Sequence, residues 1–231
     1  MEIKILASGS AGNAYVISDW ITTLLLDAGI PFAEIQKGMN YQTSRIDACL
    51  VTHRHGDHAK AVPKLLERGI PVYGPQDLSE AYRGVLFPPF FAKNWRDEAG
   101  GFKIKYFAVH HDVECYGYLI TSMKTCERLL YMTDTAYTEY TFEGVTHIMI
   151  EANHSQEAVI RNAKEGVIPD ELAERIMRSH MSIETVLGML EANDTSKLKQ
   201  VYLLHLSDDN SDAEDFKRRV QEATGAEVYV A

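Results

Sequence analysis

Short apolar runs separated by turn-forming residues dominate the pattern of this sequence. The chain opens with an alternation of apolar and polar positions over residues 1–6, and two more short runs follow before residue 26, which predicts strands joined by tight turns. Further along, short apolar runs alternate with segments whose apolar residues recur at helical spacing. Strands are predicted at residues 2–7, 13–18, 21–26, 46–51, 70–73, 102–109, 116–121, 128–132, 147–150, 201–204 and 227–230. This mixture indicates an α/β fold.

The helical segments have start and stop signals. Pro31 is expected to start one helix and Ser182 to cap another. Ser211 with Glu214 is expected to form a capping box before a helix that runs through Ala223, with Gly225 just beyond its end. Helices are predicted at residues 31–37, 59–66, 77–86, 156–165, 169–178, 182–191 and 211–223. In the helix at 169–178 the predicted apolar face contains Leu172, Ala173, Ile176 and Met177. No linker or repeat interrupts the chain, so residues 1–231 are assigned to a single domain.

A cluster of metal-binding residue types follows the predicted strand at 46–51. His53, His55, Asp57 and His58 fall within six residues. Imidazole nitrogens and carboxylate oxygens are the ligands that zinc and similar divalent metals prefer. On an extended chain His53 and His55 point the same way, and Asp57 and His58 lie beyond the turn. A metal site is therefore favoured over a polar turn with surface histidines.

Similar residue types end other predicted strands. Asp134, Glu151 and His205 each follow an apolar strand, and His110 and His111 follow the strand at 102–109. Ligands that are far apart in sequence but lie at strand ends can meet along one edge of a pair of stacked sheets. Of His110 and His111 only one is expected to serve, because neighbours on a strand point to opposite faces.

Composition narrows the classes of partner. The net charge is −10, and no basic cluster typical of a protein that coats duplex DNA is visible. A phosphate substrate stays compatible with this charge, since two bound cations would make the pocket locally positive. The modest candidates for a nucleic-acid track are Arg83, Lys93, Trp95, Arg96, Lys103 and Lys105, for which an ordinary solvated surface is favoured.

The cysteines and the apolar runs indicate the compartment. Three cysteines without paired spacing argue against a disulfide framework. The sequence shows no signal peptide and no apolar run near the ~20 residues that span a membrane. A soluble, cytoplasmic protein with no membrane partner is expected, and the choice between a monomer and a homodimer stays open. The aromatic loop at residues 87–91 is expected to cover the core.

These residues resemble the metallo-β-lactamase-fold hydrolases over most of the chain. The resemblance rests on the Thr-His-x-His-x-Asp-His motif, the later histidine, the Thr-Asp-Thr strand end and the Leu-His-Leu-Ser segment. The chain is most similar to the YycJ (WalJ)-type branch of that family, which is related to the tRNase Z-like phosphodiesterases, through residues 6–13, 111–113, 151–154, 179–182 and 204–210. The resemblance implies an αβ/βα sandwich of two mixed β-sheets flanked by helices, with metals at one edge.

The family motif also implies a set of ligands. It assigns one metal to His53, His55 and His111, a second metal to Asp57, His58 and His205, and a bridging role to Asp134. His111 is taken in preference to His110 because the family pattern puts the ligand directly before Asp112. Two divalent ions are expected, with zinc favoured and manganese as the alternative.

The resemblance further implies phosphodiester hydrolysis by a hydroxide that the two metals share. Asp57 is expected to orient this hydroxide as well as to bind metal. His180 is the candidate proton donor to the leaving oxygen, and Glu151 is its candidate partner. A surface histidine at a helix start and a structural strand-end carboxylate are the open alternatives for these two residues.

The leading hypothesis is a dinuclear metal-dependent phosphodiesterase that acts as a nuclease on single-stranded DNA ends, since the branch is associated with DNA exonuclease activity. One alternative is a phosphodiesterase for cyclic mononucleotides; the acidic charge and small size favour a small or a single-stranded substrate, and so fit both hypotheses. A further alternative is a thioester or lactone hydrolase that uses the same metals. A metal-bound binding module without catalysis is the least favoured.

Overall fold

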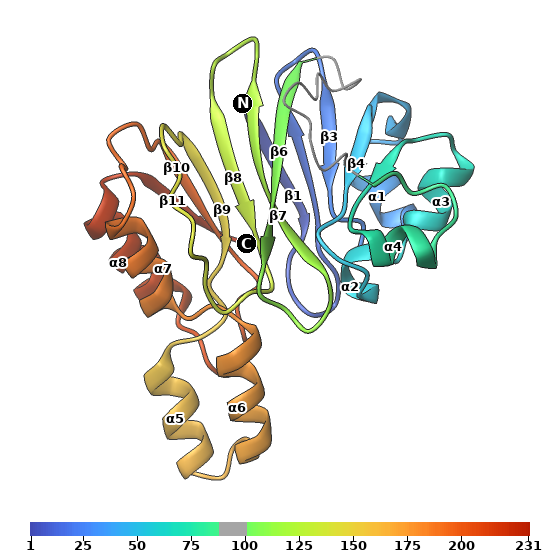
Figure 1. The fold of residues 1–231 in the computed structure, drawn as a ribbon. Coiled ribbons are helices and arrows are strands. Elements are labelled where there is room, and N and C mark those ends of the chain that lie inside the picture. The colour runs from blue at the N-terminus through green and yellow to red at the C-terminus, as the bar shows by residue number, and fades with distance from the viewer. Residues whose placement is uncertain (88–100) are drawn as a thin grey trace. The chain divides into compact units, whose positions relative to one another are not determined.

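The computed structural model describes residues 1–87 and 101–231, which divide into two compact units (Figure 1). The first unit contains Met1–Ala108 and Val113–Glu127, and the second contains Val109–Asp112 and Arg128–Ala231. Beyond Phe87 the predicted aromatic loop lies outside the described residues, as do Lys93, Trp95 and Arg96. The assignment of the chain to a single domain stays a prediction.

The first unit is built on a five-stranded sheet in the order β1-β2-β3-β4-β5. These strands are β1 (Glu2–Ala7), β2 (Ala14–Ser18), β3 (Thr23–Leu26), β4 (Ala48–Leu50) and β5 (Val72–Tyr73). The pairs β1–β2 and β2–β3 are antiparallel, whereas β3, β4 and β5 run parallel to one another, with Leu26 opposite Leu50. Both β3 and β4 therefore end at the same edge. Two further strands of this part, β6 (Phe102–Val109) and β7 (Cys115–Ser122), are neighbours in a second sheet.

Short helices pack their apolar residues against this five-stranded sheet. They are α1 (Phe32–Gly38), a 3-10 turn (Thr43–Arg45), α2 (Gly56–Ala59), α3 (Val62–Glu67) and α4 (Gln76–Ala81). Ile35 of α1, Leu65 of α3 and Leu78 of α4 share one buried cluster with Leu25 and Cys49 of the sheet. Burial of these side chains stabilises the unit by roughly 1.5–3 kcal/mol for each large one.

Three predicted helices of the first unit differ from the structure. Pro31 is the residue before α1 and not its first residue. The helix expected at 59–66 is two helices, and the earlier one already contains Asp57 and His58. The helix expected at 77–86 ends at Ala81, because Gly84 has a φ of +108° and its neighbours Arg83 and Val85 form a β-bridge.

The second unit contains four parallel strands, which are β8 (Arg128–Met132), β9 (His147–Glu151), β10 (Gln200–Leu204) and β11 (Glu227–Val230). The side chains of β9 are all buried, as expected for parallel strands covered on both faces. The register places Met132 opposite Ile150 and Leu204 opposite Glu151. The carboxyl ends of β8, β9 and β10 therefore meet at one edge, where parallel sheets commonly carry their functional residues.

Two pairs of helices complete the second unit. Helix α7 (Ile183–Glu191) packs against α8 (Ala213–Thr224), which also packs against β11. Helices α5 (Gln156–Lys164) and α6 (Asp170–Ser179) form a hairpin with its own small core around Val159 and Ala173 (Figure 1). No helix among the residues described is long and apolar enough to cross a membrane.

Two sequence signals in the second unit were misread. Asp212, and not Ser211, caps α8, because the Asp212 carboxylate accepts the Asp215 N–H. Met177 was expected on the apolar face of α6, but its side chain is 40% exposed because the hairpin core closes over Leu172 and Ile176 instead. The predicted Ser182 cap of α7 is confirmed, since the Ser182 hydroxyl accepts the Thr185 N–H.

Gly29 should not tolerate a side chain. A Cβ added there would overlap the carbonyl group of Asp57, so the turn that carries the histidines would have to move. We expect Gly29→Ala to lower the free energy of unfolding by about 1–3 kcal/mol, measured by urea denaturation. Gly188→Ala is the matched control, because a Cβ there meets no atom within 4 Å and alanine favours the helix by up to about 1 kcal/mol. Equal stability of the two variants would contradict this account.

Candidate metal centre

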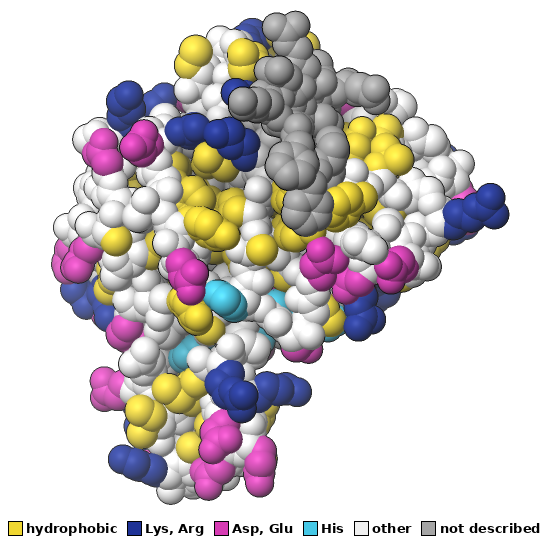
Figure 2. Space-filling model, in the orientation of Figure 1, with side chains coloured by type: hydrophobic (Ala, Val, Ile, Leu, Met, Phe, Trp, Pro, Cys, Tyr) yellow, Lys and Arg dark blue, Asp and Glu magenta, His cyan; other side chains and the backbone are white. Residues whose placement is uncertain are grey.

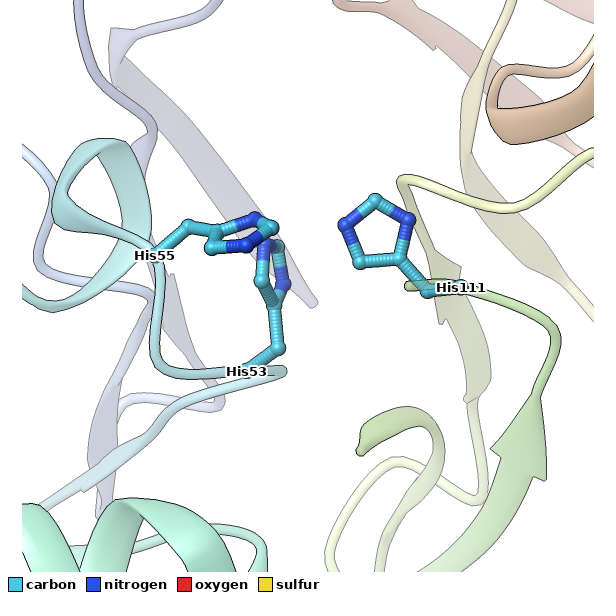
Figure 3. Close-up of side chains that lie close together, drawn as sticks. All are labelled: His53, His55 and His111. Carbon is cyan, nitrogen blue, oxygen red and sulfur yellow. The ribbon is translucent and has the colours of Figure 1, made fainter. Parts of the chain in front are cut away.

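The first unit brings four predicted ligands together on the turn from β4 into α2. His53 and His58 are fully buried, whereas the Asp57 side chain is 31% exposed. The ring centroid of His53 lies 4.7 Å from that of His55 and 4.1 Å from that of His58. Figure 3 shows His53 and His55 projecting from this turn. The turn therefore gathers three imidazoles whose roles the sequence predicted.

Asp27 is a site residue that sequence reasoning missed. It follows β3, and its buried carboxylate accepts a hydrogen bond from His58 Nδ1 at 2.8 Å and from the Thr52 backbone N–H at 2.7 Å. The Thr52 hydroxyl lies 3.1 Å from both Asp27 oxygens and 3.0 Å from His53 Nδ1. One carboxylate thus orients His58 directly and His53 through Thr52. Histidines that bind metal commonly donate their second ring N–H to such a partner.

Asn13, the last residue of the glycine-rich turn after β1, supports the same loop. Its side-chain oxygen accepts from the Gly9 N–H at 3.0 Å and the Tyr15 hydroxyl at 2.9 Å, which fixes the orientation of the amide. The amide nitrogen then lies 3.0 Å from His58 Nε2. The Asn13 backbone N–H also donates to the Asp57 carbonyl at 2.8 Å. The turn therefore positions Asp57 and His58.

The second unit brings Asp134, Glu151, His180 and His205 together at the carboxyl edge of β8–β10. One ligand atom from each of these four residues lies within 4.8 Å of the others. Glu151 Oε1 lies 2.6 Å from His180 Nδ1 and 2.9 Å from His205 Nδ1, and Asp134 Oδ1 lies 3.0 Å from His205 Nδ1. The other Glu151 oxygen accepts the backbone N–H groups of Thr135 and Met181. The predicted pair of Glu151 and His180 is in direct contact.

Asn153, which lies just after β9, ties these segments together. Its backbone N–H donates to the Met181 carbonyl and its side-chain amide donates to the His205 carbonyl, both at 2.9 Å. The Ser207 N–H donates back to the Asn153 carbonyl at 2.8 Å. These bonds explain how residues that are 28 and 52 positions apart in sequence hold one arrangement.

Three of the site residues have a left-handed backbone. Asp27, Asp134 and His205 have φ values of +56°, +52° and +55°, and each follows the end of a strand. Residues other than glycine rarely adopt this region, although Asp and His do so more often than most. Such conformations cost on the order of 1–3 kcal/mol each and cluster at functional sites.

Electrostatics in the second unit favour a cation. Burial lowers the pKa of His205, but hydrogen bonds and charge from Asp134 and Glu151 outweigh burial and raise this pKa to about 10. Burial likewise opposes the charged form of His180, and Glu151 raises its pKa overall. Burial raises the pKa of Glu151, but the two histidines together lower it. The two carboxylates therefore favour positive charge on the groups beside them. A divalent ion can supply that charge in place of the protons on the histidines.

The donor set fits a divalent metal in both units, since each unit presents neighbouring imidazoles and at least one carboxylate. The predicted ligands His53, His55, Asp57 and His58 belong to the first unit. The predicted ligands His111, Asp134 and His205 belong to the second unit.

Burial distinguishes His110 from His111, which both follow β6. The His110 side chain is 57% exposed and stacks on Tyr137 with ring centroids 4.6 Å apart. The His111 side chain is only 6% exposed. This difference supports the choice of His111 as the ligand.

Asp27→Asn should weaken metal binding. The change keeps the shape of the side chain but removes the charge that orients His58 and, through Thr52, His53. Losses of about 10–100-fold in affinity are typical for such partners, and competition with a chromophoric chelator would measure the loss. Asp19→Asn is the control, because Asp19 is an equally buried carboxylate whose bonds go to Thr22 and Ser122. An unchanged affinity in Asp27→Asn would refute the orienting role.

Stability of the metal-free protein should fall as the pH rises. A histidine whose pKa is raised on folding contributes stability that is complete below its unfolded pKa of about 6.5 and is lost as the pH approaches its folded pKa. For His205 that loss spans pH 6.5 to about 10. Urea denaturation in chelator at several pH values would measure it. The decrease in the free energy of unfolding with pH should be smaller in His205→Asn and unchanged in His110→Asn. If the free energy of unfolding of the unsubstituted protein did not change with pH, the contacts of His205 with Asp134 and Glu151 would be contradicted.

Comparison with known proteins places the chain among its relatives. Residues 22–206 match the family model described as the beta-lactamase superfamily domain. The chain is 28% identical over 228 residues to Exodeoxyribonuclease WalJ of Streptococcus pneumoniae, covering 91% of this chain and 83% of that protein. It is 27% identical over 228 residues to Exodeoxyribonuclease YycJ of Bacillus anthracis, covering 91% of this chain and 84% of the relative.

Solved structures give the same fold. The metallo-beta-lactamase fold protein YhfI from Bacillus subtilis has a TM-score of 0.74 at 18% identity, over 99% of this chain and 95% of that one. The short form of human tRNase Z has a TM-score of 0.66 at 19% identity, over 100% of this chain and 96% of that one. The predicted fold class, two mixed sheets flanked by helices, is confirmed.

The resemblance noted in the sequence is confirmed, and so is the expectation of a metal-dependent hydrolase. The kind and number of ions, a cytoplasmic location and a homodimer stay predictions. With the match extending over most of its length, the chain belongs to the beta-lactamase superfamily.

Proposed function

We propose that this protein is a dinuclear metal-dependent phosphodiesterase that acts as a nuclease on single-stranded DNA ends. The observation that carries the proposal is the contact between Glu151 and His180 in the second unit. This pair supplies a proton donor, which cleavage of a phosphodiester with a sugar alkoxide as leaving group needs. The similarity to relatives named exodeoxyribonuclease, over 91% of the chain, supports DNA as the substrate.

The proposed ligands are those of the family motif. His53, His55 and His111 would hold one ion, Asp57, His58 and His205 would hold the other, and Asp134 would bridge. When bound, two divalent ions would lower the pKa of a water molecule towards ~7 and neutralise charge on the phosphate. The partly exposed Asp57 carboxylate would orient the attacking water, because the backbone of this residue is fixed by Asn13.

His180 is proposed to protonate the leaving oxygen. Its Nδ1 lies 2.6 Å from the buried Glu151 carboxylate, which raises the pKa of the ring against the effect of burial and fixes its orientation. The side chain is 24% exposed, and its Nε2 makes no hydrogen bond with any residue in the described part of the chain. This edge of the ring is therefore accessible to a substrate, to which it could transfer a proton once the two are within hydrogen-bonding distance.

His180→Asn should separate substrates by their leaving group. For DNA, whose sugar alkoxide must be protonated, we expect kcat to fall by about 10²–10⁴-fold. For bis(p-nitrophenyl) phosphate, whose nitrophenolate leaves without a proton, we expect little change. His110→Asn is the control on the same unit and should leave both rates unchanged. Equal losses on both substrates in His180→Asn would argue against a proton donor.

A substrate panel with metal-loaded protein tests the proposed function itself. The panel compares end-labelled single-stranded DNA and RNA with a cyclic mononucleotide, a thioester and nitrocefin. We expect single-stranded DNA to have the highest kcat/KM. Preference for the cyclic mononucleotide would establish the alternative. Turnover of the acyl substrates without phosphodiester cleavage would establish a thioester or lactone hydrolase.

A further inference from the structure

Two arginines lie on the end of α6 that leads into His180. Arg175 and Arg178 are exposed and lie three positions apart, so they share one side of the helix. His180 directly follows the last residue of α6 and is its C-cap. Figure 2 shows Lys and Arg side chains over the upper part of this hairpin. The proposed proton donor thus has two guanidinium groups within the preceding two turns.

Neither guanidinium group forms an ion pair with a neighbour in the described part of the chain. Glu171 and Glu174 lie four positions before Arg175 and Arg178, a spacing that commonly forms ion pairs on helices. Within the described residues, however, neither arginine side chain makes an ion pair or a hydrogen bond. On α8 of the same unit, by contrast, Arg218 binds both Asp215 and Glu222. The charges on α6 are available to an external anion.

The distances suit a polynucleotide. At a rise of 1.5 Å per residue, the Cα atoms of the two arginines lie about 3 and 8 Å along the helix axis from His180, and their side chains lean towards the start of the helix, which adds to this separation. A phosphodiester chain carries a further phosphate on each side of the bond that is cleaved. A guanidinium group binds phosphate through two parallel hydrogen bonds, which is why arginine is common in such sites.

We propose that Arg175 and Arg178 form a phosphate-binding subsite that holds the backbone of a single-stranded nucleic acid beside the bond to be cleaved. This inference rests on the proposed function and deepens it, because it names the substrate class. A cyclic mononucleotide has a single phosphate, which is consumed at the reaction centre, and so offers this subsite nothing. A chain of nucleotides fills both places at once.

Arg175→Gln/Arg178→Gln tests the subsite, because glutamine keeps the helix and removes both charges. Arg161→Gln/Lys164→Gln is the matched control, since these two cations are also exposed, three positions apart and without an ion pair to any described residue, but lie on α5. Each metal-loaded protein would be assayed on single-stranded DNA of 2–12 nucleotides at several salt concentrations, and on bis(p-nitrophenyl) phosphate. Thermal unfolding would be followed for each variant.

We expect the α6 variant to raise KM for DNA on the order of tenfold and to leave kcat and turnover of the small ester unchanged. The plot of log(kcat/KM) against log salt has a negative slope, and each lost phosphate contact makes it shallower by about 0.7 for single strands. Loss of two contacts should therefore make the slope shallower by about 1.4. The α5 control should behave as the unsubstituted protein.

Other outcomes would overturn the subsite. If the arginines only stabilise the carboxyl end of α6 through the helix dipole, the melting temperature falls and KM and the salt slope do not change. Equal effects of the α5 and α6 variants would show a general effect of lost positive charge and would contradict a subsite at α6. If the unsubstituted protein cleaves DNA and the α6 variant has the same KM and salt dependence, the subsite is refuted and the proposed function is not. If the unsubstituted protein neither cleaves nor binds DNA, the proposed function fails with it.

Discussion

A carboxylate removed from water must be compensated by hydrogen bonds and opposite charge, or its burial costs several kcal/mol. Asp27, Asp134 and Glu151 are buried in this way at strand ends, and each is compensated by imidazole. In the first unit the imidazoles involved are His58, which binds Asp27 directly, and His53, which is linked to Asp27 through Thr52. In the second unit they are His180 and His205. The same compensation fixes the ring orientations on which metal binding and proton transfer depend. Stability and chemistry therefore use the same bonds.

The strands were largely predictable because their apolar runs are short and bounded by turn residues. The parallel strands β8, β9 and β10 were read with at most one residue of error, since full burial leaves an unmistakable apolar run. Helix ends were less accurate. Asp212 competed with Ser211 for one cap, and Gly84 ended α4 through a backbone angle that composition does not reveal.

The site could be predicted where chemistry is concentrated in sequence. His53, His55, Asp57 and His58 form a dense motif, and the pairing of Glu151 with His180 followed from the family motif and is seen as a direct contact. Asp27 and Asn13 were missed because their partners are 25 and 45 positions away, and no local pattern encodes such a bond. The unpaired state of Arg175 and Arg178 was also inaccessible, since their spacing from Glu171 and Glu174 indicates ion pairs.

The left-handed corners at residues 27, 134 and 205 have a consequence for how this fold can change. Glycine adopts this backbone conformation without steric strain, so selection for stability alone would favour glycine at each corner. Aspartate or histidine is retained there only while the function of its side chain outweighs the loss of stability from the strained backbone. Engineering for heat resistance at these corners would consequently trade activity for durability, whereas changes elsewhere on the sheets need not.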